Sequence, residues 1–431
     1  MEFSETLSYL LSLGHETLAI KLGLRNTELL LAELGNPHHS FASVQIAGTN
    51  GKGSTAVMLD SICRQAGMRT GLFTSPHLIS ITERIKISGC EISPPEFAEH
   101  ATRVRTAAES LVAQGKLQAL PTFFEHVTAI AFLAFKEANV ELAILETGLG
   151  GRLDATTVAG ARVVAITPIA LDHQDYLGAT LTEIAAEKAA IIKPGTTAII
   201  AAQRQEASNV IRRRAAECEV EPSLDDYAIS IQAATADGRF TVTFETKHGR
   251  YESVRLGLRG RHQIENAATA IRIAEALSQQ GWKIPPVAIA TGIEMAEHAG
   301  RLEVLDGYLL DGAHNPSAAR TLRGYLDEFI KVPLTLVFGA MRDKNLVEMA
   351  AILFPAATQL VLTQVANPRS ASAAELYEIA SAMAVPNVLV THSLSEALAR
   401  ANEVTSTPGL VCITGSLYLL GEAKALINDS M

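Results

Sequence analysis

The amino-acid sequence predicts an α/β fold with two domains, each built on a mostly parallel sheet. Short continuous apolar runs, as expected of strands buried on both faces, alternate with stretches of helical periodicity. This alternation is typical of parallel sheets covered by helices. The chain has 431 residues, of which 48% are hydrophobic and 19% charged, so it is long and apolar enough for two or three core-forming domains.

The N-terminal half begins with helical patterns and continues as strands separated by helices. The first forty residues carry apolar side chains at helical spacing, chiefly over 5–14 and 26–37, with Gly and Pro as stops. An apolar run, a glycine-rich loop and a helical stretch then follow directly on one another. The predicted strands are residues 41–47, 140–146, 162–169 and 196–202, and the predicted helices among them are 54–67, 121–138 and 180–192.

The pattern changes in the second half of the chain. Residues 239–246 and 251–258 alternate apolar and polar side chains around a Lys-His-Gly turn, which predicts a small antiparallel hairpin. A second α/β series follows, and we expect the chain to divide near 295–300 into domains of residues 1–297 and 298–431. The predicted strands of the second series are 307–310, 333–339, 358–363, 387–392 and 409–415.

Composition and charge exclude several classes of function. The formal net charge of −10 argues against a basic nucleic-acid-binding surface. The first residues carry acids where a signal peptide carries Lys or Arg, and no apolar run reaches the ~18 residues of a membrane helix. The four cysteines lie far apart without a C-x-x-C pair, which indicates reduced core thiols. We therefore expect a cytoplasmic monomer that acts on small molecules and binds neither nucleic acid nor membrane.

A glycine-rich loop follows the first predicted strand and opens the next helix. Its sequence, GTNGKGS, is not the usual P-loop, because two residues rather than four separate the glycines that flank the loop, and a glycine follows the lysine. Backbone N–H groups and the helix dipole at such a junction favour phosphate, although a plain glycine turn is also compatible with the pattern. The candidate phosphate-binding residues are Gly48, Thr49, Asn50, Gly51, Lys52, Gly53 and Ser54.

Two polar side chains follow later strands and are candidate metal ligands. Glu146 ends the strand 140–146, and His173 lies just past the strand 162–169, beside Asp172. Open α/β sheets bind ligands at the carboxyl ends of their strands, and Mg²⁺ prefers oxygen ligands. A capping carboxylate and a surface histidine are the structural alternatives. Lys188 lies on the helix predicted over 180–192, and its position alone predicts a solvated lysine.

A series of motifs runs over nearly the whole chain. The motifs are GTNGKGS (48–54), TSPHL (74–78), TERI (82–85), TFFEHVTAIAF (122–132), ETGLGGRLDAT (146–156), LDHQDYLG (171–178), EKAAIIKPG (187–195), GRHQIENAATA (260–270), GRLE (300–303), LDGAHNP (310–316), FGAMRDKN (338–345) and GSLYLLGE (415–422). In these motifs and their order, the chain resembles the folylpolyglutamate synthases of the bifunctional dihydrofolate synthase kind, within the Mur ligase superfamily. The resemblance implies an N-terminal P-loop-type Mur ligase central domain and a C-terminal Rossmann-like α/β domain.

The resemblance implies a ligase that uses ATP and Mg²⁺, with two ions expected. ATP phosphorylates a carboxylate of the folate substrate, and the amine of L-glutamate then displaces phosphate from the acyl phosphate. Catalysis of this kind is positioning and electrostatic stabilisation. By resemblance, the catalytic residues are Lys52, Glu146, His173 and Lys188, with Lys188 carbamylated so that it can act as a ligand for a second Mg²⁺.

The remaining site residues are also implied by the resemblance. Gly51 to Ser54 hold the ATP phosphates, and Ser75 joins Glu146 and His173 around Mg²⁺. The other nucleotide contacts are Asn266 to the adenine, Asp311 to the ribose, and Arg301 and His314 to the phosphates. The pterin-site residues are Thr122, Phe123, Phe124, Glu125, Leu153, Asp154 and Ala155.

Two other functions fit part of the pattern. Another Mur-type ligase, joining an amino acid to a cell-wall precursor, would share the ATP chemistry. A nucleotide-binding regulator without catalysis would keep the glycine loop, but it has no need of Glu146, His173 and Lys188 together.

Overall fold

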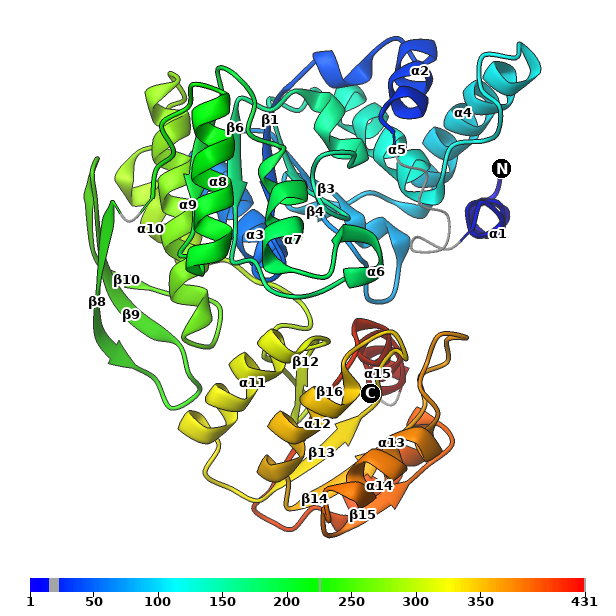
Figure 1. The fold of residues 1–431 in the computed structure, drawn as a ribbon, viewed down its shortest axis with the longest axis vertical. Coiled ribbons are helices and arrows are strands. Elements are labelled where there is room, and N and C mark those ends of the chain that lie inside the picture. The colour runs from blue at the N-terminus through cyan, green and yellow to red at the C-terminus, as the bar shows by residue number, and fades with distance from the viewer. Residues whose placement is uncertain (15–22, 225, 430–431) are drawn as a thin grey trace.

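The structure is a computed structural model that describes residues 1–14, 23–224 and 226–429, and within these ranges the strands form three sheets (Figure 1). The first sheet has the order β4-β3-β2-β5-β1-β6-β7. Strands β2, β5, β1, β6 and β7 run parallel, and β3 and β4 form an antiparallel edge. Its strands are β1 (Ala42–Ala47), β2 (Thr70–Phe73), β3 (Ile85–Ile87), β4 (Cys90–Glu91), β5 (Leu142–Glu146), β6 (Val163–Ile166) and β7 (Thr197–Ile200).

Helices cover both faces of this sheet, which explains why its strands are apolar throughout. In β5, Leu142 and Ile144 pack with α3 and α9, whereas Ala143 and Leu145 pack with α4 and α5 on the opposite face. The helices of this part are α1 (Phe3–Ser12), α2 (Arg25–Glu33), α3 (Lys52–Gln65), α4 (Pro94–Ala113), α5 (Phe123–Glu137), α6 (Gln174–Leu177), α7 (Leu181–Ala189), α8 (Gln205–Glu217), α9 (His262–Gln279) and α10 (Pro286–Glu294), with the 3₁₀ turns η1 (Pro37–His39), η2 (Ile81–Arg84) and η3 (Ala155–Ala159).

The predicted α/β class and its mostly parallel sheet are confirmed. The predicted strands of this part and the helices predicted among them are found with shorter ends, except that the helix predicted over 54–67 begins two residues earlier, as α3 (Lys52–Gln65). The helix predicted over 180–192 ends at Ala189, ahead of Pro194. Part of the helical prediction for the first forty residues, over 15–22, lies outside the described residues. Strands β2, β3 and β4 were not predicted, because two to four residues are too short to show a period.

The predicted hairpin is confirmed as β9 (Phe240–Thr246) and β10 (Arg250–Arg255), which are antiparallel. A third strand, β8 (Tyr227–Ala234), pairs with β9 and completes the second sheet. Most residues of β8 are exposed, so its sequence carries no clear inside–outside alternation. This sheet packs against α9 and α10.

The third sheet belongs to the C-terminal part and has the order β11-β12-β16-β13-β14-β15. Only β11 is antiparallel, and the five predicted strands of the second α/β series are all present. The boundary predicted near 295–300 remains a prediction; the stretch falls between α10 and β11. The elements are β11 (Glu303–Leu305), β12 (Tyr308–Asp311), β13 (Leu334–Phe338), β14 (Gln359–Leu362), β15 (Val388–Val390), β16 (Leu410–Thr414), α11 (Pro316–Phe329), α12 (Leu346–Leu353), η4 (Phe354–Ala356), α13 (Ala373–Ala382), α14 (Leu394–Val404) and α15 (Leu417–Asp429).

A close helix crossing supports α3, the helix that follows the glycine loop. A Cβ on Gly292 of α10 would lie 2.4 Å from the Cα of Ile62 in α3. Gly292→Ala is therefore expected to lower the free energy of unfolding by about 1–3 kcal/mol, because the helices must move apart. Chemical denaturation measures this loss.

Gly324→Ala is the matched control, since Gly324 lies within α11 and nothing approaches its Cβ position within 4 Å. This change is expected to stabilise the protein by about 0.4–1 kcal/mol through the unfolded chain. Equal losses in the two variants would contradict the close-approach explanation.

Candidate active site

The glycine-rich loop lies between β1 and α3, at the carboxyl edge of the first sheet, as predicted. Gly48 and Gly51 have φ values of 150° and 89°. A Cβ on Gly48 would lie 1.8 Å from Thr167 Oγ1, and one on Gly51 would lie 2.3 Å from Asn266 Oδ1. Both glycines are therefore required by close approach as well as by conformation.

The backbone N–H groups of this loop have two different uses. Thr49 and Asn50 donate theirs to the carbonyl oxygen of Pro168, at 3.1 and 3.2 Å, and so attach the loop to the segment after β6. The first-turn N–H groups of α3, which begins at Lys52, have no acceptor within the helix and can bind an anion. The backbone donors suited to phosphate are thus those of Lys52, Gly53 and Ser54.

Three of the predicted residues meet beside the loop. Lys52 Nζ lies 3.9 Å from Glu146 Oε1. Glu146 Oε2 accepts the backbone N–H of Ser75 at 3.1 Å. Burial raises the pKa of Glu146, although Lys52 and the Ser75 N–H act in the opposite direction. A buried carboxylate with one backbone donor and a distant ammonium is incompletely neutralised, and a cation near it would be stabilising.

Lys188 is buried against the loop and is not the solvated lysine that its helix position suggests. Its Nζ donates to the carbonyl oxygen of Gly48 at 2.6 Å. Burial, together with the charge of Lys52, lowers the pKa of Lys188 to about 7. A large share of this amine is therefore unprotonated and nucleophilic at neutral pH.

His173 lies at the N-terminus of the short helix α6, on the loop after β6, with a left-handed φ of 52°. Its ring is partly exposed, and burial lowers its pKa, so the ring is neutral at pH 7. Within residues 1–14, 23–224 and 226–429, no three His, Cys, Asp or Glu side chains are grouped so that they could hold a metal ion. Of the predicted metal ligands, Glu146 and His173 are of these residue types, whereas Ser75 and Lys188 are not. Metal binding by the four residues together remains a prediction.

The predicted nucleotide contacts of the C-terminal part face the loop from the other side. Arg301 Nη1 donates to the carbonyl oxygen of Gly312 at 3.3 Å, and its charge is near enough to Glu146 to lower the pKa of that carboxyl. Asp311 ends β12, and its carboxylate accepts the N–H groups of Leu302 and Ala313, each at 3.1 Å.

The predicted adenine contact, Asn266, belongs to the N-terminal part. It is in α9, with its amide against Gly51.

Asp172 joins the two parts of the chain, although its position in the sequence predicts no role for it beyond being a neighbour of His173. It accepts from Asn315 Nδ2 at 2.9 Å and from Lys344 Nζ at 2.7 Å, and His314 Nε2 lies 3.5 Å away. Asn315 Nδ2 also donates to Asn50 of the loop at 3.1 Å. Figure 1 shows α6, which follows this loop, at the edge of the N-terminal part that faces the C-terminal part.

The seven predicted pterin-site residues have structural contacts of their own. Thr122 and Glu125 form a capping box at the start of α5, and Glu125 also accepts from Thr27 at 3.1 Å. Asp154 caps the turn η3 and accepts the N–H of Leu149 at 3.0 Å. Phe123 and Ala155 are buried. Phe124 and Leu153 keep partly exposed surface, and Phe124 lies against Gly148, where a Cβ would be 2.5 Å from its ring.

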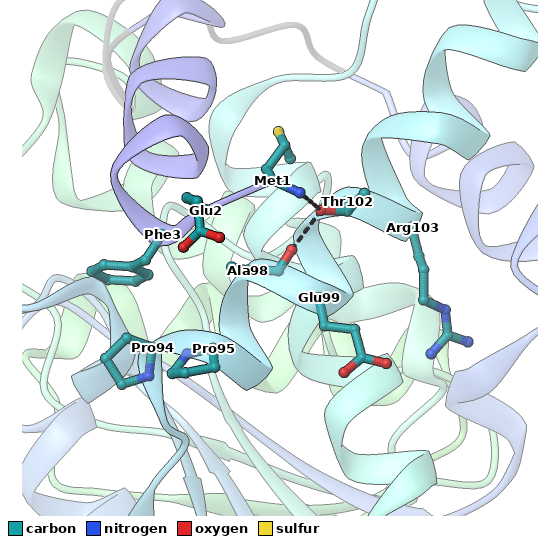
Figure 2. A pocket seen from close by; sticks show the side chains of 9 residues that line it. All are labelled: Met1, Glu2, Phe3, Pro94, Pro95, Ala98, Glu99, Thr102 and Arg103. Carbon is teal, nitrogen blue, oxygen red and sulfur yellow. Dashed lines mark hydrogen bonds between the residues drawn. The ribbon is translucent and has the colours of Figure 1, made fainter.

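A surface pocket of about 510 Å³ contains none of these residues (Figure 2). It lies between the chain's first residues and α4, where the Met1 amine donates to Thr102 Oγ1 at 2.9 Å. Figure 2 shows Pro94 and Pro95 at one side and Arg103 at the other. We assign it no role in the candidate site.

Comparison with known proteins agrees with this arrangement of loop and facing domains. The Mur ligase middle domain matches residues 46–274, and the glutamate ligase domain of the Mur ligases matches residues 300–417. The dihydrofolate synthase/folylpolyglutamate synthase of Bacillus subtilis is 34% identical over 419 residues, which cover 95% of this chain and 96% of that protein. The chain belongs to this family of ATP-dependent Mur ligases.

Solved structures of the family have the same fold over the full length. The folylpolyglutamate synthase of Mycobacterium tuberculosis complexed with ADP aligns with a TM-score of 0.92 at 31% identity, covering 99% of this chain and 98% of that one. Escherichia coli FolC in complex with DHPP and ADP aligns with a TM-score of 0.88 at 30% identity, covering 100% and 98%. The chain spans about half the length, 51% and 50%, of two archaeal relatives named probable bifunctional folylpolyglutamate synthase/dihydropteroate synthase.

None of the helices in the described ranges of this family member combines the length and apolarity needed to cross a membrane.

Proposed function

We propose that this chain ligates L-glutamate to folates with ATP, and that it also uses dihydropteroate. The observation that carries the proposal is the meeting of Lys52, Glu146, Ser75 and Lys188 around the glycine loop, opposite Arg301 of the C-terminal part. The relatives' ADP complexes and full-length similarity support it. We further propose that it acts as a monomer, without nucleic-acid or membrane partners.

The proposed reaction has two steps. An oxygen of the substrate carboxylate attacks the γ-phosphorus of ATP, the bond to the bridging oxygen breaks, and ADP leaves. The neutral amine of L-glutamate then attacks the acyl carbon, the C–N bond forms, and phosphate leaves with the acyl oxygen and takes up the proton that the amine loses. Lys52 and the first-turn N–H groups of α3 bind phosphate oxygens, while Arg301 and His314 approach from the C-terminal part. Asn266 contacts the adenine, and Asp311 contacts the ribose.

The residues around Glu146 fit a Mg²⁺ site. Glu146 is buried, and the Lys52 ammonium that pairs with it is 3.9 Å away, too far for a hydrogen bond. The adjacent Thr147 Oγ1 is a buried polar atom without a hydrogen-bond partner within the described residues. These oxygens are the ligands that Mg²⁺ prefers. Ser75, Glu146 and His173 would hold the ion, which supplies charge stabilisation at the transferred phosphoryl group when bound.

Carbamylation of Lys188 fits its surroundings. A carbamate forms when a neutral amine attacks CO₂, and the lowered pKa of Lys188 provides that amine. The amine loses one proton to solvent as the N–C bond forms. The product keeps one N–H, which can still donate to the carbonyl oxygen of Gly48, and carries one negative charge shared by two oxygens, which would be ligands for a second Mg²⁺. The nearby ammonium of Lys52 would stabilise this charge.

Use of dihydropteroate is proposed on the pterin-site residues 122–125 and 153–155. Phe124 and Leu153 keep exposed surface on which a pterin ring could pack. The DHPP complex of E. coli FolC supports the proposal.

The test is ATP-dependent phosphate release by the purified protein with Mg²⁺ and L-glutamate. Dihydropteroate, tetrahydrofolate and a UDP-linked cell-wall precursor are compared as acceptors. Release with the first two supports the proposal. Release with tetrahydrofolate alone limits the activity to chain extension and removes the roles of 122–125 and 153–155, and release with the UDP-linked compound alone overturns the proposal.

A further inference from the structure

His298 lies in the connection between α10 and β11, and its ring reaches the first turn of α3. Its Nδ1 lies 3.1 Å from Ser54 Oγ, although the two residues are 244 positions apart. A Cβ on Gly53 would lie 2.8 Å from His298 Cε1, so the glycine at that position allows the ring to approach. Taken as a whole residue, His298 is partly exposed.

The position of the ring proton depends on the hydrogen bonds around Ser54. Gln263 Nε2 donates to Ser54 Oγ at 3.3 Å, and Asn266 Nδ2 donates to Gln263 Oε1 at 2.9 Å, which orients the Gln263 amide. The Ser54 hydroxyl has one proton and two lone pairs, so after accepting from Gln263 it is free to donate to His298 Nδ1 or to accept from it. Burial and the charge of Arg301 lower the pKa of His298, so the ring is neutral. With Ser54 donating to Nδ1, the ring proton lies on Nε2.

His298 Nε2 lies beside Gly53. The Cβ position of Gly53 is 3.2 Å from His298 Nε2 and 3.4 Å from Glu146 Oε2, so the ring nitrogen and the carboxylate border the same small region. This region adjoins the first-turn N–H groups of α3, which bind phosphate in the proposed function. A neutral N–H donor is suited to an anionic oxygen there.

We propose that His298 is a further nucleotide-binding residue, whose Nε2–H donates to the terminal phosphate of ATP bound at the first turn of α3. This inference rests on the proposed function. His298 belongs to the connection between the two parts. Its hydrogen bond to the terminal phosphate would therefore hold that connection in place only when ATP is bound. ADP, which lacks this phosphate, cannot make the contact.

The test compares the dissociation constants of ADP and AMPPCP, a non-hydrolysable ATP analogue, measured by calorimetry with Mg²⁺. Asparagine places its amide near the Nδ1 position, so His298→Asn can keep the contact to Ser54 and lose the Nε2–H donor. It is expected to weaken AMPPCP binding by about tenfold to a hundredfold, as for one hydrogen bond to a charged group, and to leave ADP binding unchanged. His298→Gln, which places a donor near Nε2, is expected to retain most of the preference for AMPPCP.

His262 provides a matched control, because it contacts Gln263 but neither Ser54 nor Gly53. His262→Asn is expected to change the two dissociation constants by the same factor. Both constants are measured on one protein sample, so a general loss of folded protein does not alter their ratio. His298→Ala provides the same ratio if the asparagine variant does not fold.

Each outcome is decisive. If the ratio of the ADP and AMPPCP dissociation constants is the same in the His298 variants as in the wild type, the inference is wrong. The proposed function still stands in that case, provided that the wild-type protein binds both nucleotides. If the wild-type protein binds neither nucleotide, the proposed function fails and the inference fails with it. A loss confined to AMPPCP in His298→Asn and His298→Ala, and absent in His262→Asn, supports the contact.

Discussion

Lys188→Ala is expected to reduce the rate constant for ligation by about 10²–10³-fold, the range found when one preorganised charge-stabilising group is removed. The variant lacks both the proposed carbamate and the bond from Nζ to the Gly48 carbonyl oxygen. The measurement is phosphate release at saturating ATP, folate and glutamate. Added acetate, which supplies a free carboxylate, is expected to restore part of the rate.

The matched control is Lys193→Ala, because Lys193 is exposed on the segment just after α7. Its activity is expected to equal that of the wild type. Full activity of Lys188→Ala would contradict both the carbamate and any catalytic role for the lysine. A loss without acetate rescue would instead favour a role in holding the loop.

Added bicarbonate supplies CO₂ and is expected to activate the enzyme by carbamylating Lys188. The rate of this activation depends on pH through the pKa of Lys188, which burial and Lys52 lower to about 7. Above pH 7 the folded protein holds the amine mainly unprotonated, whereas below pH 7 the ammonium cannot attack CO₂. Activation by added bicarbonate is therefore expected to become slower as pH falls below about 7. An activation rate independent of pH between 6 and 8 would contradict this assignment.

Asp172→Ala is expected to destabilise the packing of the two parts against each other, because it removes the carboxylate 2.7 Å from the buried Lys344 ammonium and leaves that ammonium paired with Asp343, at 3.8 Å. The expected cost is at most about 3–5 kcal/mol, the cost of breaking a buried ion pair. The Lys344 and Asp172 side chains are only 9% and 6% exposed, and their polar atoms are 2.7 Å apart. Burial raises the pKa of Asp172, but His314, His173 and Lys344 outweigh it and hold the pKa well below its usual range, so the carboxylate is charged at neutral pH. Small-angle scattering is expected to show a larger radius of gyration for the variant.

Arg342→Ala is the control for the same loop. Arg342 pairs with Glu375, but both side chains are largely exposed, so about 0.2–1 kcal/mol is expected. A double-mutant cycle of Asp172 and Lys344 isolates their coupling. An unchanged radius of gyration in Asp172→Ala, with no coupling to Lys344, would show that the ion pair does not hold the two parts together.

The polar cluster at Asp172 also connects the site to closure of the two parts. Asn315, which caps α11, contacts both Asp172 and Asn50 of the glycine loop. Movement of the C-terminal part therefore changes contacts at the loop that binds the nucleotide. Closure of domains around a substrate is a common way to assemble a catalytic site and exclude water.

The sequence by itself determined the α/β class, the predicted strands of both large sheets, and the place of the loop and of Glu146 at the ends of strands. These features follow from local causes, because apolar runs, helical spacing and glycines act within a few residues. The exposed strand β8 and the short strands β2, β3, β4 and β11 were missed, since their sequences carry no period that sets them apart from loops.

Only the tertiary structure decided which distant side chains meet. Lys188 and Gly48 are 140 positions apart, Lys344 and Asp172 are 172 apart, and His298 and Ser54 are 244 apart. No local pattern distinguishes a buried lysine at a loop carbonyl from a solvated one, or a histidine in a connection from one on the surface. Those contacts, and the pKa shift that burial gives Lys188, exist only because the sheets and helices bring separate strand ends to one edge.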